Sequence, residues 1–270
     1  MDNHQFSIAR SCRCVALSRA AYYRSPAPPE IKDSEIIGAL NELIEKRPRR
    51  GFWKCFKLLR RQGHRWNHKR VYRVYCAMRL NQKRRAKKRL PARERQPLVV
   101  PQRPDEVWSG DFMSDALYGG RRFRTFNVID DYNREGVAIE IDTSITSRRL
   151  VRVFEQLKAE RGLPAILRVD NGPEFLGEAF TEWAQENGMF IQYIQPGKPN
   201  QNAFIERFNR TYREEVLDVY LFSNLSEVRE ITHSWLIEYN EDRPHDSLDG
   251  RTPAEHLTHN AGDSTFELST

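Results

Sequence analysis

Hydrophobic residues recur at helical spacing in three short stretches of the first eighty residues. Pro48 and Gly63 interrupt the pattern, and Ser34 and Asn67 lie where helix N-caps are expected. The pattern predicts helices over residues 34–46, 51–63 and 67–80. Three short helices joined by short turns are typical of a helix-turn-helix-like, all-α module, which we place at residues 31–80.

The segments that flank this module have other patterns. Residues 1–30 predict only a short helical segment with one turn. Residues 81–104 have no periodic apolar face, are rich in Lys and Arg, and are interrupted by proline. We interpret them as a basic linker, which therefore marks a domain boundary.

Strand-like and helix-like patterns alternate beyond residue 105. Three strands joined by short connections predict an antiparallel meander, at residues 107–113, 121–133 and 136–142. Later segments predict helices at 147–161, 173–187 and 225–239, another beginning near Asn202, and strands at 165–170 and 190–196. This order predicts an α/β domain, a mixed sheet with helices on its faces, over residues 105–260. A disordered tail is expected at residues 261–270.

Charge divides the chain at the same place. Residues 1–100 contain 26 Lys/Arg and 7 Asp/Glu, a net charge of +19, whereas residues 101–270 contain 18 and 30, a net charge of −12. A basic excess of this size predicts nucleic acid as the partner. The candidate DNA contacts are Lys69, Arg70 and Arg73 on the third helix; the alternative is a solvated charged surface.

Composition also excludes other classes of protein. The apolar runs are far shorter than the roughly 18 residues of a membrane span, and the first residues lack the apolar core of a secretory signal. The four cysteines show no paired CxxC spacing, at Cys12, Cys14, Cys55 and Cys76. We therefore expect a reduced cytoplasmic protein, associated with the nucleoid through DNA.

Three acidic residues lie at positions that suggest either a specific interaction or a functional role for the carboxylate. Asp111 falls mid-strand in WSGDFM, where Asp is unfavourable without a partner. Asp170 ends the strand ILRVD, and open α/β sheets bind ligands at the carboxyl ends of their strands. Glu206 flanks the apolar stripe of an amphipathic helix, QNAFIERFNR. Taken alone, Asp170 is an ordinary turn residue; taken together, the three predict a cluster at one rim of the sheet.

Converging carboxylates raise one another's pKa, and a divalent cation removes that cost. An all-oxygen ligand set favours Mg²⁺ or Mn²⁺, and two such ions about 4 Å apart suit a phosphoryl displacement on DNA. Zinc is the weaker alternative, because its candidate ligands are two histidines and two cysteines that suit helix-packing positions, His64, His68, Cys55 and Cys76.

The spacing of the acids resembles a known signature. Between Asp111 and Asp170 lie 58 residues, and between Asp170 and Glu206 lie 35, as in the D, D-35-E pattern of the retroviral-integrase superfamily. Five segments resemble bacterial insertion-sequence transposases whose second reading frame encodes the integrase core: WSGDFMSD, FRTFNVIDDYNRE, LRVDNGPEF, IQPGKPNQNAFIERFNRTYREE and YNEDRPHDSLDGRTPAE. The likeness runs from about residue 6 to residue 257, nearly the whole chain.

The resemblance implies a fold and a reaction. The core would be ribonuclease H-like, with Asp111, Asp170 and Glu206 as the metal ligands. Family enzymes nick one strand at a transposon end and use the freed 3′-OH to attack a second DNA. Candidate DNA contacts beside the site are Lys198, Asn202, Arg210 and Arg213. The partners would be terminal inverted repeats and target DNA, bound by a homo-oligomer.

Other functions fit parts of the same pattern. The chain could be a DNA-binding regulator or assembly partner without chemistry. It could also act only when fused to an upstream reading-frame product, since it has no leucine zipper of its own. A nuclease without strand transfer would use the same three acids.

Overall fold

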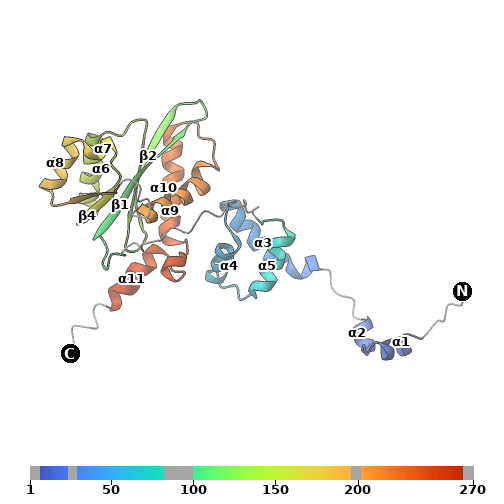
Figure 1. The fold of residues 1–270 in the computed structure, drawn as a ribbon. Helices are drawn as coiled ribbons and strands as arrows, with labels where there is room; N and C mark the ends of the chain where they lie inside the picture. The colour runs from blue at the N-terminus through green and yellow to red at the C-terminus, as the bar shows by residue number, and fades with distance from the viewer. Residues whose placement is uncertain (1–6, 24–28, 82–99, 196–201, 264–270) are drawn as a thin grey trace, which may run out of the picture. The chain divides into compact units, whose positions relative to one another are not determined.

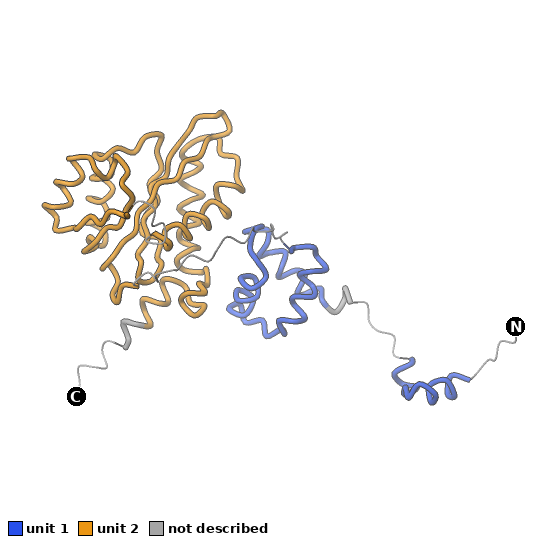
Figure 2. Tube along the Cα trace, viewed as in Figure 1, with its two compact units in different colours: residues 1–83 blue, residues 84–270 orange. Residues whose placement is uncertain are grey.

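The computed structural model describes residues 7–23, 29–81, 100–195 and 202–263 (Figure 1). The chain forms two compact units, residues 1–83 and 84–270 (Figure 2). Most of the linker predicted at 81–104 and of the tail predicted at 261–270 lies outside the described residues. In the part of the chain that is described, no helix is long and apolar enough to span a membrane.

In the residues that the structure describes, unit 1 contains helices and no strand. It contains α1 (Ile8–Cys14), α2 (Arg19–Tyr23), α3 (Pro29–Lys46), α4 (Phe52–Arg61) and α5 (His68–Ala77). The last three share one core of side chains that are almost fully buried, including Ile36, Leu40, Cys55, Leu59 and Val71. This is the helix-turn-helix-like module that the periodicity predicts.

Two of the three helix ends predicted from capping residues in unit 1 are found in the structure. The Asn67 side chain accepts a hydrogen bond from the Lys69 amide (2.8 Å), and Gly63 follows α4 with a positive φ of 90°. The predicted N-cap at Ser34 is wrong, because α3 begins five residues earlier, at Pro29. Proline suits a first helical position, where its missing N–H is not needed.

Unit 2 is built on one five-stranded mixed sheet. Its strands are β1 (Val107–Ala116), β2 (Arg122–Asp130), β3 (Gly136–Asp142), β4 (Ile166–Val169) and β5 (Phe190–Tyr193). They are ordered β3-β2-β1-β4-β5, with an antiparallel β1-β2-β3 meander and with β4 and β5 parallel to β1. The meander and the α/β class are as predicted.

Helices cover both faces of this sheet (Figure 1). Successive residues of a strand face opposite sides; on β2, Phe126 and Val128 join one core, and Phe123 and Ile129 join another. The first core is closed by α6 (Ser147–Glu160), α7 (Pro173–Leu176) and α8 (Glu178–Glu186). The second is closed by α9 (Ala203–Tyr212), the π-helical turn η2 (Arg213–Leu217) and α10 (Leu225–Glu241).

Two features of unit 2 differ from the pattern. The helix predicted at 173–187 is broken at Gly177, whose backbone approaches Ser147 so closely that a Cβ would lie 2.8 Å from the serine Cβ. A short 3₁₀ turn, η3 (Asp246–Leu248), and α11 (Pro253–Asp263) follow α10 and were not predicted. The signal for α11 is a capping box, in which Thr252 and Glu255 exchange side-chain-to-amide hydrogen bonds (2.9 and 3.2 Å).

The packing of β3 against α9 and α10 leads to a stability prediction. A Cβ at Gly136 would overlap Leu236 and would lie 2.9 Å from a ring carbon of Phe208. Gly136→Ala should therefore lower the free energy of unfolding of unit 2 by about 1–3 kcal/mol, the usual effect of overpacking. Gly119→Ala, where nothing lies within 4 Å of the added carbon, is the control. Urea unfolding measures both, and equal midpoints would contradict the packing described.

Candidate active site

Asp111 lies in the middle of the central strand β1, directly opposite Asn127 of β2. Its carboxylate is half-buried and accepts a hydrogen bond from the Phe112 amide (2.9 Å). The pKa of Asp111 is raised to about 6, chiefly by burial; the negative charges of Asp170 and Glu206 contribute to the rise, and the hydrogen bonds from Phe112 and Asn209 oppose it. The structure thus brings the charges of the three predicted acids to bear on one another.

Asp170 directly follows β4, which runs parallel to β1. Ser109 of β1 is paired with Arg168 of β4, so Asp111 and Asp170 each follow this pair by two residues on neighbouring chains. The Gly172 amide donates a hydrogen bond to Asp170 Oδ1 (3.1 Å), which closes an Asx turn. A Cβ at Gly172 would lie 3.0 Å from that oxygen and 3.1 Å from Glu174 Oε2. The D-N-G-P sequence therefore forms a turn, and this turn holds an exposed carboxylate at the strand end.

Glu206 lies in the first turn of α9, on the exposed side of the helix. The predicted apolar stripe is buried, with Ile205, Phe208 and Tyr212 packed in the second core. Since α9 packs on β1 and β2, this stripe fixes which side of the helix Glu206 occupies.

The donor set fits a hard divalent cation, because it consists of carboxylate oxygens only. Within the described residues, none of Asp111, Asp170 and Glu206 forms a salt bridge, whereas acids around them do. As the side chains are placed, no group of three or more His, Cys, Asp or Glu in the described segments is arranged to hold a metal ion. The exposed carboxylates of Asp170 and Glu206 would have to turn toward Asp111 to coordinate one jointly.

The described residues of unit 1 give the zinc alternative no support. Cys55 is fully buried in the helical core, which raises the pKa of its thiol to about 11. His64 stacks on Trp66 with ring centroids 4.1 Å apart, and His68 stacks on Trp53. These side chains serve packing, as the helical pattern indicates.

Asn209 is a site residue that the sequence reasoning missed. Its side-chain amide donates to Asp111 Oδ2 (2.8 Å), and its carbonyl accepts a hydrogen bond from the Asn127 amide (2.6 Å). Asn127 is fully buried on β2 and Asn209 is 7% exposed. Two signals could have found the pair: Asn209 lies three residues after Glu206, and Asn127 would face Asp111 in the register of a tight meander.

Glu174 and Arg124 form a second supporting contact. They are joined by a salt bridge, and the Arg124 guanidinium lies 4.3 Å from the ring centre of Phe112. Glu174, in the first turn of α7, thus ties this helix to β2 beside Asp170.

Other acids of unit 2 have arginine partners. Asp131 is fully buried and pairs with Arg168 (2.6 Å), and Glu135 pairs with Arg161 (2.8 Å). Arg213 binds Asp115 (3.0 Å) and the Ser114 carbonyl (2.9 Å), which anchors the helix end to β1.

The remaining predicted DNA contacts differ in their exposure to solvent and in their partners. Arg210 is exposed, Asn202 is buried at the start of α9, and Lys198 lies outside the described residues. In unit 1, Lys69 is exposed, while Arg70 and Arg73 both bind Asp33 (2.8 and 2.6 Å).

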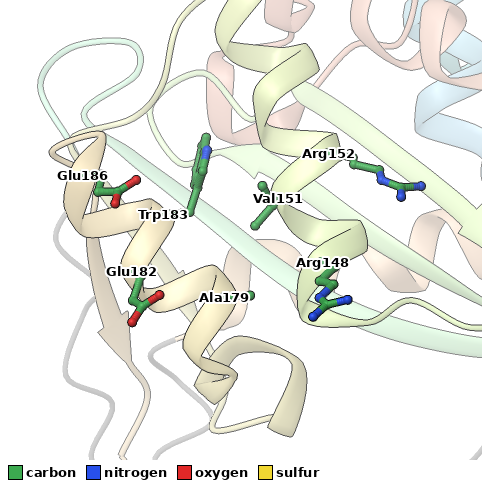
Figure 3. A pocket seen from close by; sticks show the side chains of 7 residues that line it. All are labelled: Arg148, Val151, Arg152, Ala179, Glu182, Trp183 and Glu186. Atoms are coloured by element: carbon green, nitrogen blue, oxygen red, sulfur yellow. The ribbon is translucent and has the colours of Figure 1, made fainter.

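A shallow pocket lies between α6 and α8, away from the three acids (Figure 3). Arg148 and Arg152 line it from α6, and Glu182 and Glu186 line it from α8, with Trp183 between. It contains none of Asp111, Asp170 and Glu206, so the candidate site is an open rim of the sheet and not this pocket.

Comparison with known proteins identifies the two units. Two models of the integrase core domain match residues 101–199 and 187–253, and a model of an HTH-like domain matches residues 31–89. An uncharacterized protein of insertion element IS407 from Burkholderia multivorans is 39% identical, over 92% of this chain and 90% of its own length. One of insertion element IS476 from Xanthomonas euvesicatoria is 38% identical, over 94% of this chain and 72% of its own.

More distant matches agree in kind. The putative transposase InsK of insertion sequence IS150 from Escherichia coli is 24% identical, over 90% of this chain and 91% of its own length. Among solved structures, a chain of the simian T-cell lymphotropic virus intasome is 15% identical, with a TM-score of 0.49, over 73% of this chain and 68% of that one. The family models, the insertion-element relatives and the five-stranded mixed sheet together confirm the expected ribonuclease H-like integrase core preceded by an HTH-like domain, and the chain belongs to the integrase-core family of insertion-element proteins.

Proposed function

We propose that this chain is a DDE transposase, a polynucleotidyl transferase that nicks DNA at transposon ends and joins the freed 3′-OH to target DNA. The observation that carries the proposal is the placement of the three acids on adjoining elements: Asp111 on β1, Asp170 at the end of the neighbouring parallel strand β4, and Glu206 on α9, which packs on β1. Among the described residues no salt bridge engages these acids, so their carboxylates are available to a divalent cation.

Asp111, Asp170 and Glu206 would hold one or two divalent ions, Mg²⁺ or Mn²⁺. Bound ions would stabilise charge on the attacking and leaving oxygens of an in-line displacement at phosphorus. In the first step a water oxygen bonds to phosphorus and the 3′-oxygen leaves as the hydroxyl. In the second step the oxygen of that hydroxyl bonds to the phosphorus of a target phosphodiester, and the 3′-oxygen of the target strand leaves as a hydroxyl. Neither step needs a covalent bond to the protein.

The chain's own residues provide the geometry. Asn209 holds one Asp111 oxygen and the Phe112 amide holds the other, so the central carboxylate has a fixed direction. The Gly172 amide holds Asp170 at the strand end. DNA would be supplied by the basic unit, as terminal inverted repeats and target, and a homo-oligomer would bring two ends together.

The acidic residues provide the most direct test. Asp170→Asn, Asp111→Asn and Glu206→Gln should each lower nicking of terminal-repeat DNA in Mg²⁺ by on the order of 10²–10³-fold or more, because charge stabilisation is lost. Binding of the same DNA should persist. Glu214→Gln, an exposed acid just beyond the same helix, is the matched control. Chelation of divalent ions should have the same effect as the three substitutions.

The outcomes separate the competing functions. Nicking that survives Asp170→Asn would sink the triad assignment. Nicking without joining would identify a nuclease, and DNA binding without either reaction would identify a regulator. Strand transfer by a fusion to an upstream reading-frame product, but not by this chain alone, would show dependence on that product.

The Asn127–Asn209–Asp111 chain generates a second prediction. Asn209→Ala removes the donor to Asp111 Oδ2 and leaves the Asn127 amide with only the weak acceptor Met113 Sδ (3.2 Å). We expect the Mg²⁺ concentration for half-maximal nicking to rise about 10- to 100-fold, the usual range for residues that orient metal ligands. The double variant with Asn127→Ala should be little worse, because both act through one contact.

Asn133→Ala is the control for this experiment. Asn133 is also fully buried, but it bonds to Glu135 and to the Pro253 carbonyl, away from the acids. It should lower thermal stability without changing the Mg²⁺ requirement. An unchanged requirement in Asn209→Ala would contradict the orienting role.

A further inference from the structure

The surface formed by α4 and α5 combines positive charge with exposed aromatic rings. From Phe52 to Ala77 the chain contains no Asp or Glu. It contains eight basic residues, Lys54, Lys57, Arg60, Arg61, Arg65, Lys69, Arg70 and Arg73. A surface of this charge favours a polyanion.

Two large aromatic side chains on this surface are exposed to an unusual extent. Trp53 of α4 is 60% exposed and Tyr72 of α5 is 49% exposed. Most tryptophans of globular proteins are largely buried, so an exposed one flanked by basic residues indicates a contact surface.

These rings are held in place by their neighbours. His68 stacks against Trp53 with ring centroids 6.0 Å apart and 29° between planes. Phe52 packs edge-on against Trp53 (5.1 Å) and against Tyr72 (4.8 Å). Trp53 and His68 thus stack on each other, and Phe52 links Trp53 to Tyr72; we call Trp53, His68 and Tyr72 the aromatic ridge.

The other side of α5 is already engaged. Arg70 and Arg73 bind Asp33 of α3, whose side chain is only 6% exposed. Removing both arginines would leave a buried carboxylate unpaired, so they stabilise the packing of α3 on α5. Lys69, by contrast, is exposed next to His68 and one turn before Tyr72.

Aromatic faces stack on nucleobases only where the base face is accessible. Inside a duplex each base is covered by its neighbours, whereas unpaired and terminal bases present a free face. We propose that the aromatic ridge binds DNA at unpaired or terminal bases, with Lys69 on the adjacent phosphate, and that Arg70 and Arg73 hold the module together. The inference rests on the proposed function, which makes nicked transposon ends the substrate.

The test measures DNA binding without chemistry. Full-length protein carrying Asp170→Asn is titrated with two labelled DNAs of one sequence, a linear duplex with a single-stranded end and a covalently closed circular duplex, which has neither ends nor loops. Trp53→Ala should weaken binding to the open-ended DNA by about 5- to 100-fold, the effect of losing one stacked base, and leave binding to the closed DNA within about twofold. Tyr72→Ala should act in the same direction.

Three comparisons keep the result interpretable. Trp53→Phe, which keeps an aromatic face, should restore most of the affinity. Tyr118→Ala removes an 80% exposed ring from the other unit and should change neither affinity. Lys69→Gln should lower the salt dependence of log K by about 0.7–0.9, the value for one phosphate contact. Circular dichroism confirms that each variant retains its helices.

Specific results would overturn the proposal. Equal loss on open and closed DNA by a folded Trp53→Ala variant would exclude stacking on free bases. Unchanged affinity for both DNAs would assign the ridge to a protein partner. Neither result depends on nicking, so the proposal can fail while the acidic site stands, and a failed nicking assay leaves these affinities unaffected.

Discussion

A carboxylate placed halfway along the central strand of a sheet is the constraint on which the rest of the site depends. Burial alone would favour the protonated form of Asp111, and two neighbouring acids add to that tendency. Donors from Phe112 and Asn209 oppose it by holding the ionised oxygens. The protein therefore keeps a charged group where charge is costly and directs its oxygens, which is how a preorganised cation site is built.

The helix α9 presents two residues of the candidate site, Glu206 and Asn209, and both must face the site at the same time. Glu206 and Asn209 lie one turn apart on it, so the rotation that presents one also presents the other. That rotation is fixed by packing, since Ile205, Phe208 and Tyr212 are buried in the second core. Beyond α9, Glu215 accepts a hydrogen bond from the Trp235 indole (3.0 Å) and pairs with Arg243, which fixes the π-helical turn against α10.

Much of this arrangement follows from local signals in the sequence. The mid-strand position of Asp111, the strand end at Asp170 and the apolar stripe beside Glu206 each depend on a few neighbouring residues. The features that sequence reasoning missed depend on distant ones. Gly177 at the helix break is in close contact with Ser147, and Arg70 and Arg73 are engaged by Asp33, which lies 37 and 40 positions away. The Asn209 contact requires both the strand register of Asn127 and the docking of α9, and periodicity fixes neither.

Arginine pairing balances several of the acids that surround the candidate site. The buried Asp131 and the half-buried Glu135 and Glu174 are each neutralised by an arginine from a different element. Such pairs join the strands and helices of the fold, and their charge is balanced within it. Asp111, Asp170 and Glu206 have no salt bridge in the described part of the chain, although unit 2 has arginines close by. Lack of a salt bridge is not particular to these three, since the buried Asp130 of β2 has none in the described residues and is held by the Asp105 and Tyr132 amides instead. What distinguishes Asp111, Asp170 and Glu206 is their placement on β1, at the end of the neighbouring β4 and on α9, which is the arrangement that the proposed metal ions would need.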